Sequence, residues 1–280
     1  SATGVHGDSP TALHSRTLYG VSNKHPRLQV LADRDVQSGS YVLYWCQAAM
    51  RSRWNHALEY TISRANRAGV PVLAVFCLSP GYPGATWRAY DFLLRGLAEL
   101  LPSLQERGIS ARVALGPAPD CIPALARDAC EVVTDRGYLR IQREWRTAVA
   151  ESCGKRLTQV EAEVLVPVEL ASDREEYAAA TIRRKIHRHL DASAGGLTHL
   201  EVEHRATPQM PKTSFRLVDQ NELLTAAEAH VHADQSVGAV QHPAGERAAA
   251  AAFEAFVAER LPAYAELRSD PALSWDSGMS

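Results

Sequence analysis

The sequence lacks the features that mark membrane-spanning and secreted proteins. In its 280 residues no apolar run approaches the roughly 18 residues that a membrane helix needs. Residues 1–26 contain no apolar stretch of the kind found in secretory signals. The formal net charge of −2 gives no general attraction to nucleic acid, because phosphate binding depends on clustered Lys and Arg. We therefore expect a cytoplasmic globular protein without membrane contact, in which any DNA contact comes from a local patch.

Cysteine is scarce, and its spacing favours neither disulfides nor metal. The cysteines are odd in number, and no two have the two-residue gap of zinc or redox pairs. His187 with His189, and His230 with His232, form His-X-His pairs, but no Cys, Asp or Glu follows at a metal-ligand spacing. We expect reduced, mostly buried thiols and no metal site. The five cysteines are Cys46, Cys77, Cys121, Cys130 and Cys153.

Local catalytic and phosphate-binding signatures are also missing. No strand is followed by a phosphate-cradling glycine fingerprint or a P-loop, which disfavours a Rossmann dinucleotide site and a nucleoside triphosphatase. No Gly-X-Ser-X-Gly elbow selects a nucleophile. We assign no catalytic residue in this chain.

What the sequence does contain is a regular alternation of buried strands and amphipathic helices. The alternation predicts a doubly wound α/β domain with a mostly parallel five-stranded sheet. Residues 1–40 show no sustained period and are expected to form a tail. The expected strands are 41–45, 70–78, 111–115, 131–134 and 157–160, and the expected helices are 51–68, 87–107, 122–128 and 140–151.

The pattern changes after residue 167. Ser172, with Glu175 and Glu176, predicts a capping box that begins a helix ending near residue 190. This helix ends in a basic run, residues 183–189, which we interpret as a complement to the helix dipole rather than a phosphate site. Residues 191–241 are polar and predict a loosely held linker with one short helix at 221–230. A further helix is expected at 245–261.

Three loops are placed to bind a ligand. The carboxyl ends of strands in an open α/β sheet carry its ligand sites, and residues 46–51, 79–83 and 135–140 follow the expected strands there. Trp45, Gln47 and Tyr138 have the planar and hydrogen-bonding groups that a ring ligand needs. Considered one at a time, these aromatic residues are also consistent with a structural role in the hydrophobic core.

Several segments, taken in order, resemble the class II cyclobutane pyrimidine dimer photolyases. They begin with 41–47 (YVLYWCQ), 55–60 (NHALEY) and 135–140 (DRGYLR). They continue with 145–146 (WR), 159–161 (QVE), 166–169 (VPVE), 175–179 (EEYAA) and 181–183 (TIR). The order and spacing of these segments identify the chain as a photolyase-like sequence from about residue 27 onward.

The resemblance implies an N-terminal α/β domain that can hold a light-harvesting antenna, often 8-hydroxy-5-deazaflavin. The antenna crevice would be formed by Trp45, Gln47, Arg51 and Tyr138. Two positions depart from the usual pattern of the family. Ala89 replaces a histidine, and Cys46 replaces a methionine.

The resemblance also implies a C-terminal helical domain that binds FAD and UV-damaged DNA. Relatives of this kind repair pyrimidine dimers by light-driven electron transfer from reduced FAD. The edge of the FAD site would consist of Tyr264, Asp276, Ser277, Gly278, Met279 and Ser280.

These implications give an expected domain organisation. We expect a tail at 1–40, an α/β domain at 41–170, a helix and linker at 171–241, and the start of an incomplete FAD-binding domain at 242–280. The chain would then be the N-terminal portion of a deoxyribodipyrimidine photo-lyase, a carbon-carbon lyase. We expect it to be monomeric and inactive alone. The alternatives are a stand-alone chromophore-binding or photosensory module without repair activity, and a fold reused as an interaction domain.

Overall fold

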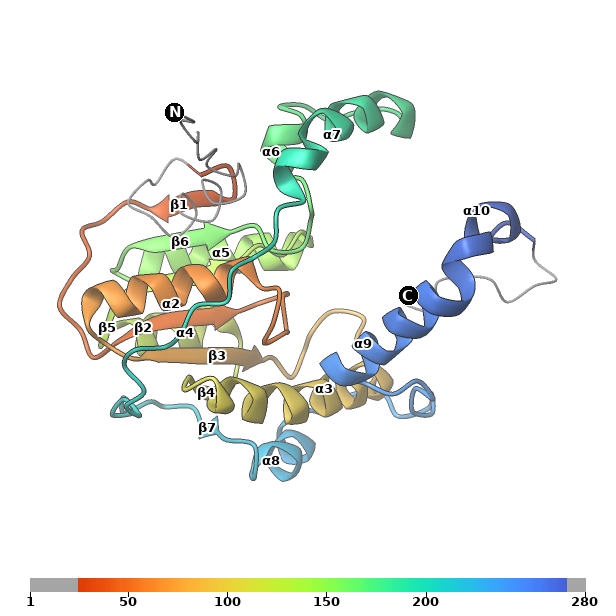
Figure 1. Ribbon diagram of the computed structural model, residues 1–280. Coiled ribbons are helices and arrows are strands. Elements are labelled where there is room, and N and C mark those ends of the chain that lie inside the picture. Colours follow the sequence, from red (N-terminus) through yellow and green to blue (C-terminus); the bar gives the residue numbers. More distant parts are fainter. Residues whose placement is uncertain (1–24, 271–280) are drawn as a thin grey trace, which may run out of the picture.

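A seven-stranded sheet organises the protein in the computed structural model, which describes residues 25–270 (Figure 1). Its strand order is β1-β6-β5-β2-β3-β4-β7. The five inner strands are parallel, and both edge strands are antiparallel to their neighbours. The strands are β1 Leu28–Ala32, β2 Tyr41–Cys46, β3 Val72–Leu78, β4 Ser110–Leu115, β5 Ala129–Asp135, β6 Leu157–Val160 and β7 Leu217–Val218.

The five predicted parallel strands are confirmed, and the two edge strands were missed. Strand β1 lies in the segment that we predicted to be a tail, and that part of the prediction is wrong. β1 is only partly buried, so it lacks the continuous apolar run that identifies an inner parallel strand. Strand β7 has two residues, too few to produce a periodic signal. Pairing with β6 and β4, respectively, is what creates these strands.

Helices cover both faces of the sheet, and alternate residues of β2 supply the two cores. Val42 and Tyr44 point into a core shared with α2 and α3, whereas Leu43 and Trp45 point into one shared with α4 and α5. This is the doubly wound arrangement that the alternation predicted. The covering helices are α2 His56–Ala68, α3 Trp87–Glu106, α4 Ala118–Ala126 and α5 Arg140–Ser152.

Helix α2 begins five residues later than predicted. The Asn55 side chain accepts hydrogen bonds from the backbone N–H groups of Ala57 and Leu58, and thereby caps the first turn. Trp54, which precedes this cap, has a φ of 51° and cannot continue a helix backward. The helix ends at Ala68 as predicted, because the next residue, Gly69, adopts the left-handed conformation.

The predicted cap at Ser172 is wrong. Ser172 follows the short helix α6 Val168–Ala171 with an extended backbone, and the next helix, α7 Ala179–Ser193, begins at a different cap residue, Ala178. Glu176 does not reach back to a helix N-terminus. Its carboxylate instead accepts hydrogen bonds from Ser172 Oγ and from Lys185 Nζ.

The segment predicted to be a loosely held linker contributes to the core. Val202, Val218 and Leu223 are buried within the same cluster as α2 and α3. The backbone N–H of Leu200 donates to the buried carboxylate of Glu59 at 2.7 Å. The short helix α8, Leu223–His230, confirms the helix predicted there. Polar composition concealed this packing, because its apolar contacts are single residues rather than a periodic stripe.

Two helical arms project from the α/β body (Figure 1). One is α7, which has no buried residue. The other runs through α9 Glu246–Ala255, the π-helical turn Phe256–Arg260, the 3-10 turn Leu261–Ala263 and α10 Tyr264–Leu267. On this arm Phe253 and Leu261 are exposed, whereas Phe256 is buried and packs edge-on against Tyr264.

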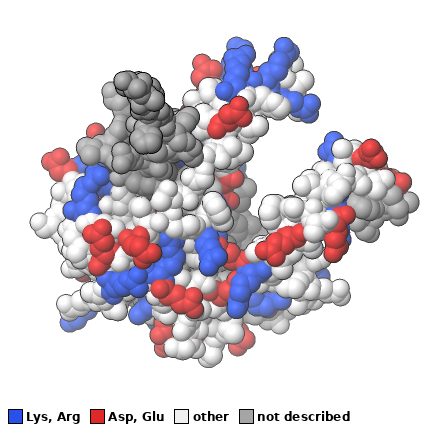
Figure 2. All heavy atoms as spheres, viewed as in Figure 1, with Lys and Arg blue, Asp and Glu red and all other residues white. Residues whose placement is uncertain are grey.

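Basic side chains gather on the α7 arm, while acidic and basic side chains alternate over the α/β body on the face drawn (Figure 2). The α7 residues responsible are Arg183, Arg184, Lys185 and Arg188. None of the helices in residues 25–270 combines the length and the apolar character needed to cross a membrane.

Candidate functional site

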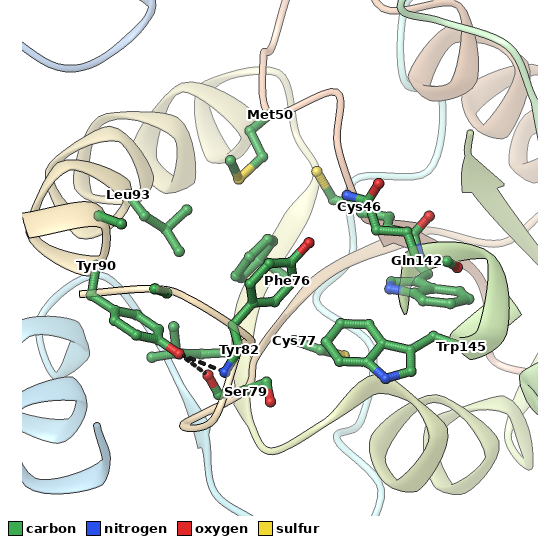
Figure 3. A pocket seen from close by; sticks show the side chains of 15 residues that line it. Cys46, Met50, Phe76, Cys77, Ser79, Tyr82, Tyr90, Leu93, Gln142 and Trp145 are labelled. Carbon is green, nitrogen blue, oxygen red and sulfur yellow. Dashed lines mark hydrogen bonds between the residues drawn. The ribbon is translucent and has the colours of Figure 1, made fainter. Parts of the chain in front are cut away.

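An apolar crevice lies at the carboxyl ends of β2 and β3 (Figure 3). From β2 the chain proceeds to β3 and β4 on one side of the sheet and returns to β5 and β6 on the other. The crevice therefore sits at the point where strand order reverses, as expected for this class of sheet. Its volume is about 200 Å³. The lining residues are Trp45, Cys46, Gln47, Met50, Phe76, Cys77, Leu78, Ser79, Tyr82, Ala85, Ala89, Tyr90, Leu93, Gln142 and Trp145.

Aromatic side chains from three different elements form one wall of the crevice (Figure 3). Phe76 lies in β3, Tyr82 in the following loop and Trp145 in α5. The rings of Tyr82 and Trp145 meet edge to face, with centroids 5.9 Å apart. This arrangement presents aromatic surface toward a shared space, which suits a planar ring ligand.

Tyr90 fixes the loop that carries Tyr82. Its hydroxyl donates to the carbonyl oxygen of Ser79 at 2.7 Å and accepts the backbone N–H of Tyr82 at 3.0 Å. Tyr90 is itself buried in α3. The Tyr82 ring is therefore positioned by a rigid helix, although it lies on a loop.

The opposite side of the crevice is aliphatic. Met50 and Leu93 point toward the aromatic wall (Figure 3). Ala89, one turn before Leu93 on α3, also lines the crevice. Met50 is exposed, and methionine adapts its shape readily to a neighbour.

The Asp135 carboxylate shapes the floor of the site. It is fully buried at the end of β5 and accepts the backbone N–H groups of Gln47, Ala48 and Ala49, which follow β2. It also accepts the Tyr44 hydroxyl at 3.2 Å. Burial raises the pKa of Asp135, and the three backbone N–H groups oppose that effect.

Gln47 joins this loop to α5. Its amide oxygen accepts hydrogen bonds from the Arg146 guanidinium and the Gly137 backbone N–H. Its amide nitrogen donates to the carbonyl oxygen of Gln142 at 3.1 Å. Gln47 lines the crevice as predicted, but both ends of its amide are already bonded within the protein. Its role here is to hold α5 against the sheet.

The four predicted crevice residues do not all meet in one place. Trp45 and Gln47 line the apolar crevice. Tyr138 lies in a separate polar cavity next to Arg136, whose guanidinium is 5.3 Å from the Tyr138 ring centroid. Arg51 pairs with Glu163 at 2.8 Å and does not line either cavity.

Most of the aromatic wall was not predicted from the sequence. Trp145 appeared only within a family-like segment, and Phe76, Tyr82 and Tyr90 were interpreted as strand, loop and helix-core residues. Their common feature is proximity to the end of β2 in space. Residue Tyr82 could have been found from the sequence, because it lies in a loop already predicted to border the ligand site.

The predicted edge of a flavin site falls mostly outside the described residues. Asp276, Ser277, Gly278, Met279 and Ser280 all lie beyond residue 270. Tyr264 is described, and it packs against Phe256 with ring centroids 5.2 Å apart. The Arg268 guanidinium lies 5.9 Å from the Tyr264 ring centroid.

The histidine pairs and cysteines do not assemble a metal centre in the described part of the chain. Residues 25–270 contain no group of three or more His, Cys, Asp or Glu side chains placed to hold a metal ion. All five cysteines are free and buried, as predicted.

Comparison with known proteins gives a consistent assignment. The family described as DNA photolyase matches residues 42–211. A deoxyribodipyrimidine photo-lyase of Methanothermobacter thermautotrophicus is 36% identical over 96% of this chain and 56% of its own length. One of Potorous tridactylus is 32% identical over 84% of this chain and 43% of its own length. The chain thus spans about half the length of these relatives.

Solved structures share the fold. A cryptochrome from Synechocystis has a TM-score of 0.61 at 18% identity, over 87% of this chain and 52% of its own. A class III photolyase from Agrobacterium tumefaciens has the same TM-score and identity, over 88% of this chain and 50% of its own. These structures show the shared fold. The family match covers more than half of the sequence, so the chain belongs to the DNA photolyase family.

Proposed function

We propose that this chain forms the antenna-type portion of a class II deoxyribodipyrimidine photo-lyase, with the apolar crevice as the antenna site. The observation that carries the antenna proposal is the aromatic wall at the strand-order reversal, formed by Phe76, Tyr82 and Trp145. The repair activity rests on the curated relatives, both named deoxyribodipyrimidine photo-lyase. The class II assignment rests on the segments quoted above, such as residues 135–140.

The crevice suits a planar aromatic ring such as that of 8-hydroxy-5-deazaflavin. Its lining is mainly apolar and aromatic, with polar groups restricted to a few positions that include Gln142 and Ser79. The volume of about 200 Å³ is below the roughly 300 Å³ typical of small-molecule sites. A tricyclic ring would therefore extend toward solvent past Met50, whose side chain is exposed and adaptable.

The residues that form and support the crevice have separate physical roles in this proposal. Trp145 and Tyr82 offer aromatic surface to the ring, and Tyr90 holds Tyr82 in place. Gln47 and Asp135 fix the floor, so that the ring enters a preformed space. Preorganisation of this kind limits the entropy lost on binding. A bound chromophore would supply absorption of visible light, which is chemistry that the side chains lack.

The flavin and DNA functions belong to the proposal as well. We place the edge of an FAD site at Tyr264 and residues 276–280, and we propose UV-damaged DNA as the substrate of the whole protein. Reduced FAD, when bound, supplies the electron for dimer cleavage. Removing a damaged base from its stack costs a few kcal/mol, and this cost is smallest for a base that is already poorly stacked. The arm that runs from α9 to α10 carries two exposed apolar side chains, Phe253 and Leu261, suited to packing against a helical domain.

Chromophore binding tests the proposal directly. The 280-residue chain is mixed with 8-hydroxy-5-deazaflavin, freed of excess ligand by gel filtration, and assayed by visible absorption. We expect stoichiometric retention and a loss of affinity of about tenfold in Trp145→Ala, because the ring loses an aromatic wall.

A matched control separates this effect from a general loss of tryptophan. Trp54 is exposed and lies outside the crevice, so Trp54→Ala should retain the chromophore. A colourless, folded wild-type preparation would reject the antenna site. Equal losses in Trp54→Ala and Trp145→Ala would reject the role of the aromatic wall.

Repair is tested separately, on a protein that contains this chain and spans the full length of the relatives. It should remove cyclobutane dimers from irradiated DNA in blue light and not in the dark. Retention of the chromophore without light-dependent repair would instead support the photosensory alternative.

A further inference from the structure

A second cavity lies on the other side of Gln47, and its chemistry differs from that of the crevice. Its volume is about 320 Å³, and it opens between α5, β1, β6 and the loop after β5. Three guanidinium groups, of Arg136, Arg143 and Arg146, line it. Gln29 and Gln159 from the antiparallel β1–β6 pair complete the polar wall.

Arg146 is the unusual member of this group. Its side chain is buried, with only 6% of the residue exposed, yet it forms no ion pair with any described residue. Its hydrogen bond goes to a neutral acceptor, the amide oxygen of Gln47. Burial, followed by repulsion from Arg136, lowers the pKa of Arg146 to about 10, so the group remains charged at neutral pH. The negative charge of Asp135 opposes part of this effect. A buried charge that has no ion-pair partner is costly.

The other two arginines differ in whether an acidic side chain pairs with their positive charge. Arg136 pairs with Glu169 at 2.6 Å and with Glu161 at 3.5 Å. Arg143 is exposed and has neither an ion pair nor a side-chain hydrogen bond within residues 25–270. The buried carboxylate of Asp135 attracts the charge of Arg146 but accepts no hydrogen bond from it, because it is engaged by three backbone N–H groups and the Tyr44 hydroxyl. Arg143 and Arg146 therefore form no ion pair within residues 25–270.

Besides the arginines, the cavity wall carries two side-chain amides, which offer neutral hydrogen-bonding groups. Gln159 donates from its amide nitrogen to the amide oxygen of Gln29 at 2.8 Å. This bond leaves the amide nitrogen of Gln29 as a donor at the cavity wall. Guanidinium groups supplemented by neutral donors are suited to an oxyanion with several acceptor atoms.

We propose that this cavity binds a small phosphate-bearing anion between Arg143 and Arg146. Phosphate fits better than a carboxylate, because its additional oxygens allow both arginines and an amide donor to be satisfied together. The site is distinct from the antenna crevice, because the Gln47–Arg146 hydrogen bond closes the boundary between them. It does not depend on the proposed antenna function.

Phosphate binding is tested by calorimetric titration of the 280-residue chain at constant ionic strength, with chloride as the balancing anion. Inorganic phosphate is the primary probe, adenosine monophosphate tests for a larger phosphorylated ligand, and acetate tests the carboxylate alternative. We expect saturable binding of phosphate that weakens about tenfold or more in Arg143→Gln and in Arg146→Gln.

The control is Arg140→Gln, which removes the same charge from the same helix. Arg140 is exposed, pairs with Glu144 and does not line the cavity, so this variant should bind phosphate as the wild type does. Arg143 is exposed and can be replaced without disturbing the core, which keeps the test valid if Arg146→Gln does not fold.

The outcomes are distinct. Tighter binding of adenosine monophosphate than of phosphate identifies a phosphorylated small molecule, and equal binding identifies the free anion. Either result supports the site if both cavity variants lose affinity. The proposal is overturned if wild type binds no phosphate saturably, if acetate binds as tightly as phosphate, or if Arg140→Gln weakens binding as much as Arg143→Gln.

Discussion

The carboxylate of Asp135 accepts the backbone N–H of Gln47 at 2.7 Å, across the ends of two neighbouring parallel strands. The same carboxylate bonds to the next two N–H groups of the loop, and the Gln47 side chain continues the network to Arg146. Gln47 thus separates the apolar crevice from the polar cavity. The geometry of both sites depends on this one buried carboxylate.

Replacing Asp135 with Asn should destabilise the fold by about 2–4 kcal/mol, because one of the two accepting oxygens becomes a donor that faces backbone N–H groups. Chemical denaturation measures the change in unfolding free energy. Asp120 is exposed in the first turn of α4, so Asp120→Asn is a suitable control and should shift stability by less than about 0.5 kcal/mol. Equal stability of the Asp135→Asn variant and wild type would refute the structural role.

Filling the crevice from α3 should block the chromophore without unfolding the protein. Ala89 is exposed and lines the crevice, so Ala89→Trp places a bulky ring at its opening. We expect deazaflavin retention to fall by about tenfold or more, with the thermal midpoint nearly unchanged. Gln105→Trp, at an exposed position near the far end of the same helix, should retain the chromophore. Undiminished retention by Ala89→Trp would place the ring elsewhere.

His56 should make the protein sensitive to acid. Burial, aided by the positive charge of Arg27, lowers the pKa of His56 to about 3, whereas an unfolded histidine titrates near 6.5. The unfolded state therefore binds more protons between these values, and stability falls as pH falls through this window. The expected loss attributable to His56 is about 2 kcal/mol between pH 7.5 and pH 5.

The comparison of wild type with His56→Gln isolates this contribution. Denaturation at both pH values should show a smaller acid-induced loss in the variant. His187 is exposed, and His187→Gln should leave the pH dependence unchanged. If His56→Gln loses as much stability on acidification as wild type does, another group is responsible.

Glu59 should anchor the segment after α7 to the body. Its buried carboxylate accepts hydrogen bonds from Arg107 Nη2 and from the Leu200 backbone N–H. Glu59→Gln removes the charge that compensates Arg107, and we expect a loss of about 2–3 kcal/mol. Hydrogen exchange at Leu200 should accelerate more than exchange in the central strands. Glu106→Gln, at an exposed position, is the control, and unchanged exchange at Leu200 in Glu59→Gln would contradict the anchoring role.

The inner sheet was predictable because its strands carry their own signal. Residues 41–46 are continuously apolar and buried on both faces, the pattern of a central parallel strand. The edge strands carry no such signal. Leu217–Val218 becomes a strand because β4 offers an unpaired edge to it, which a local pattern cannot reveal.

The position of the crevice was predictable from the sequence, but the set of residues that line it was not. The rule for open sheets selected the loops after β2, β3 and β5, and Trp45 and Gln47 line the crevice there. The rule could not predict that residues of these loops line two separate spaces, an apolar crevice and a polar cavity. That division depends on how α5 packs, because Trp145 faces one space and Arg146 borders the other.

The sequence by itself determined the alternation of strands and helices and the resemblance to photolyases, since these depend on local periodicity and on the order of segments. Only the tertiary structure decided which side chains share a space. Phe76, Tyr82 and Trp145 meet, whereas Arg51 and Tyr138 lie elsewhere. The physical reason is that a crevice is formed between elements, and the packing of α3 and α5 against β2 sets it.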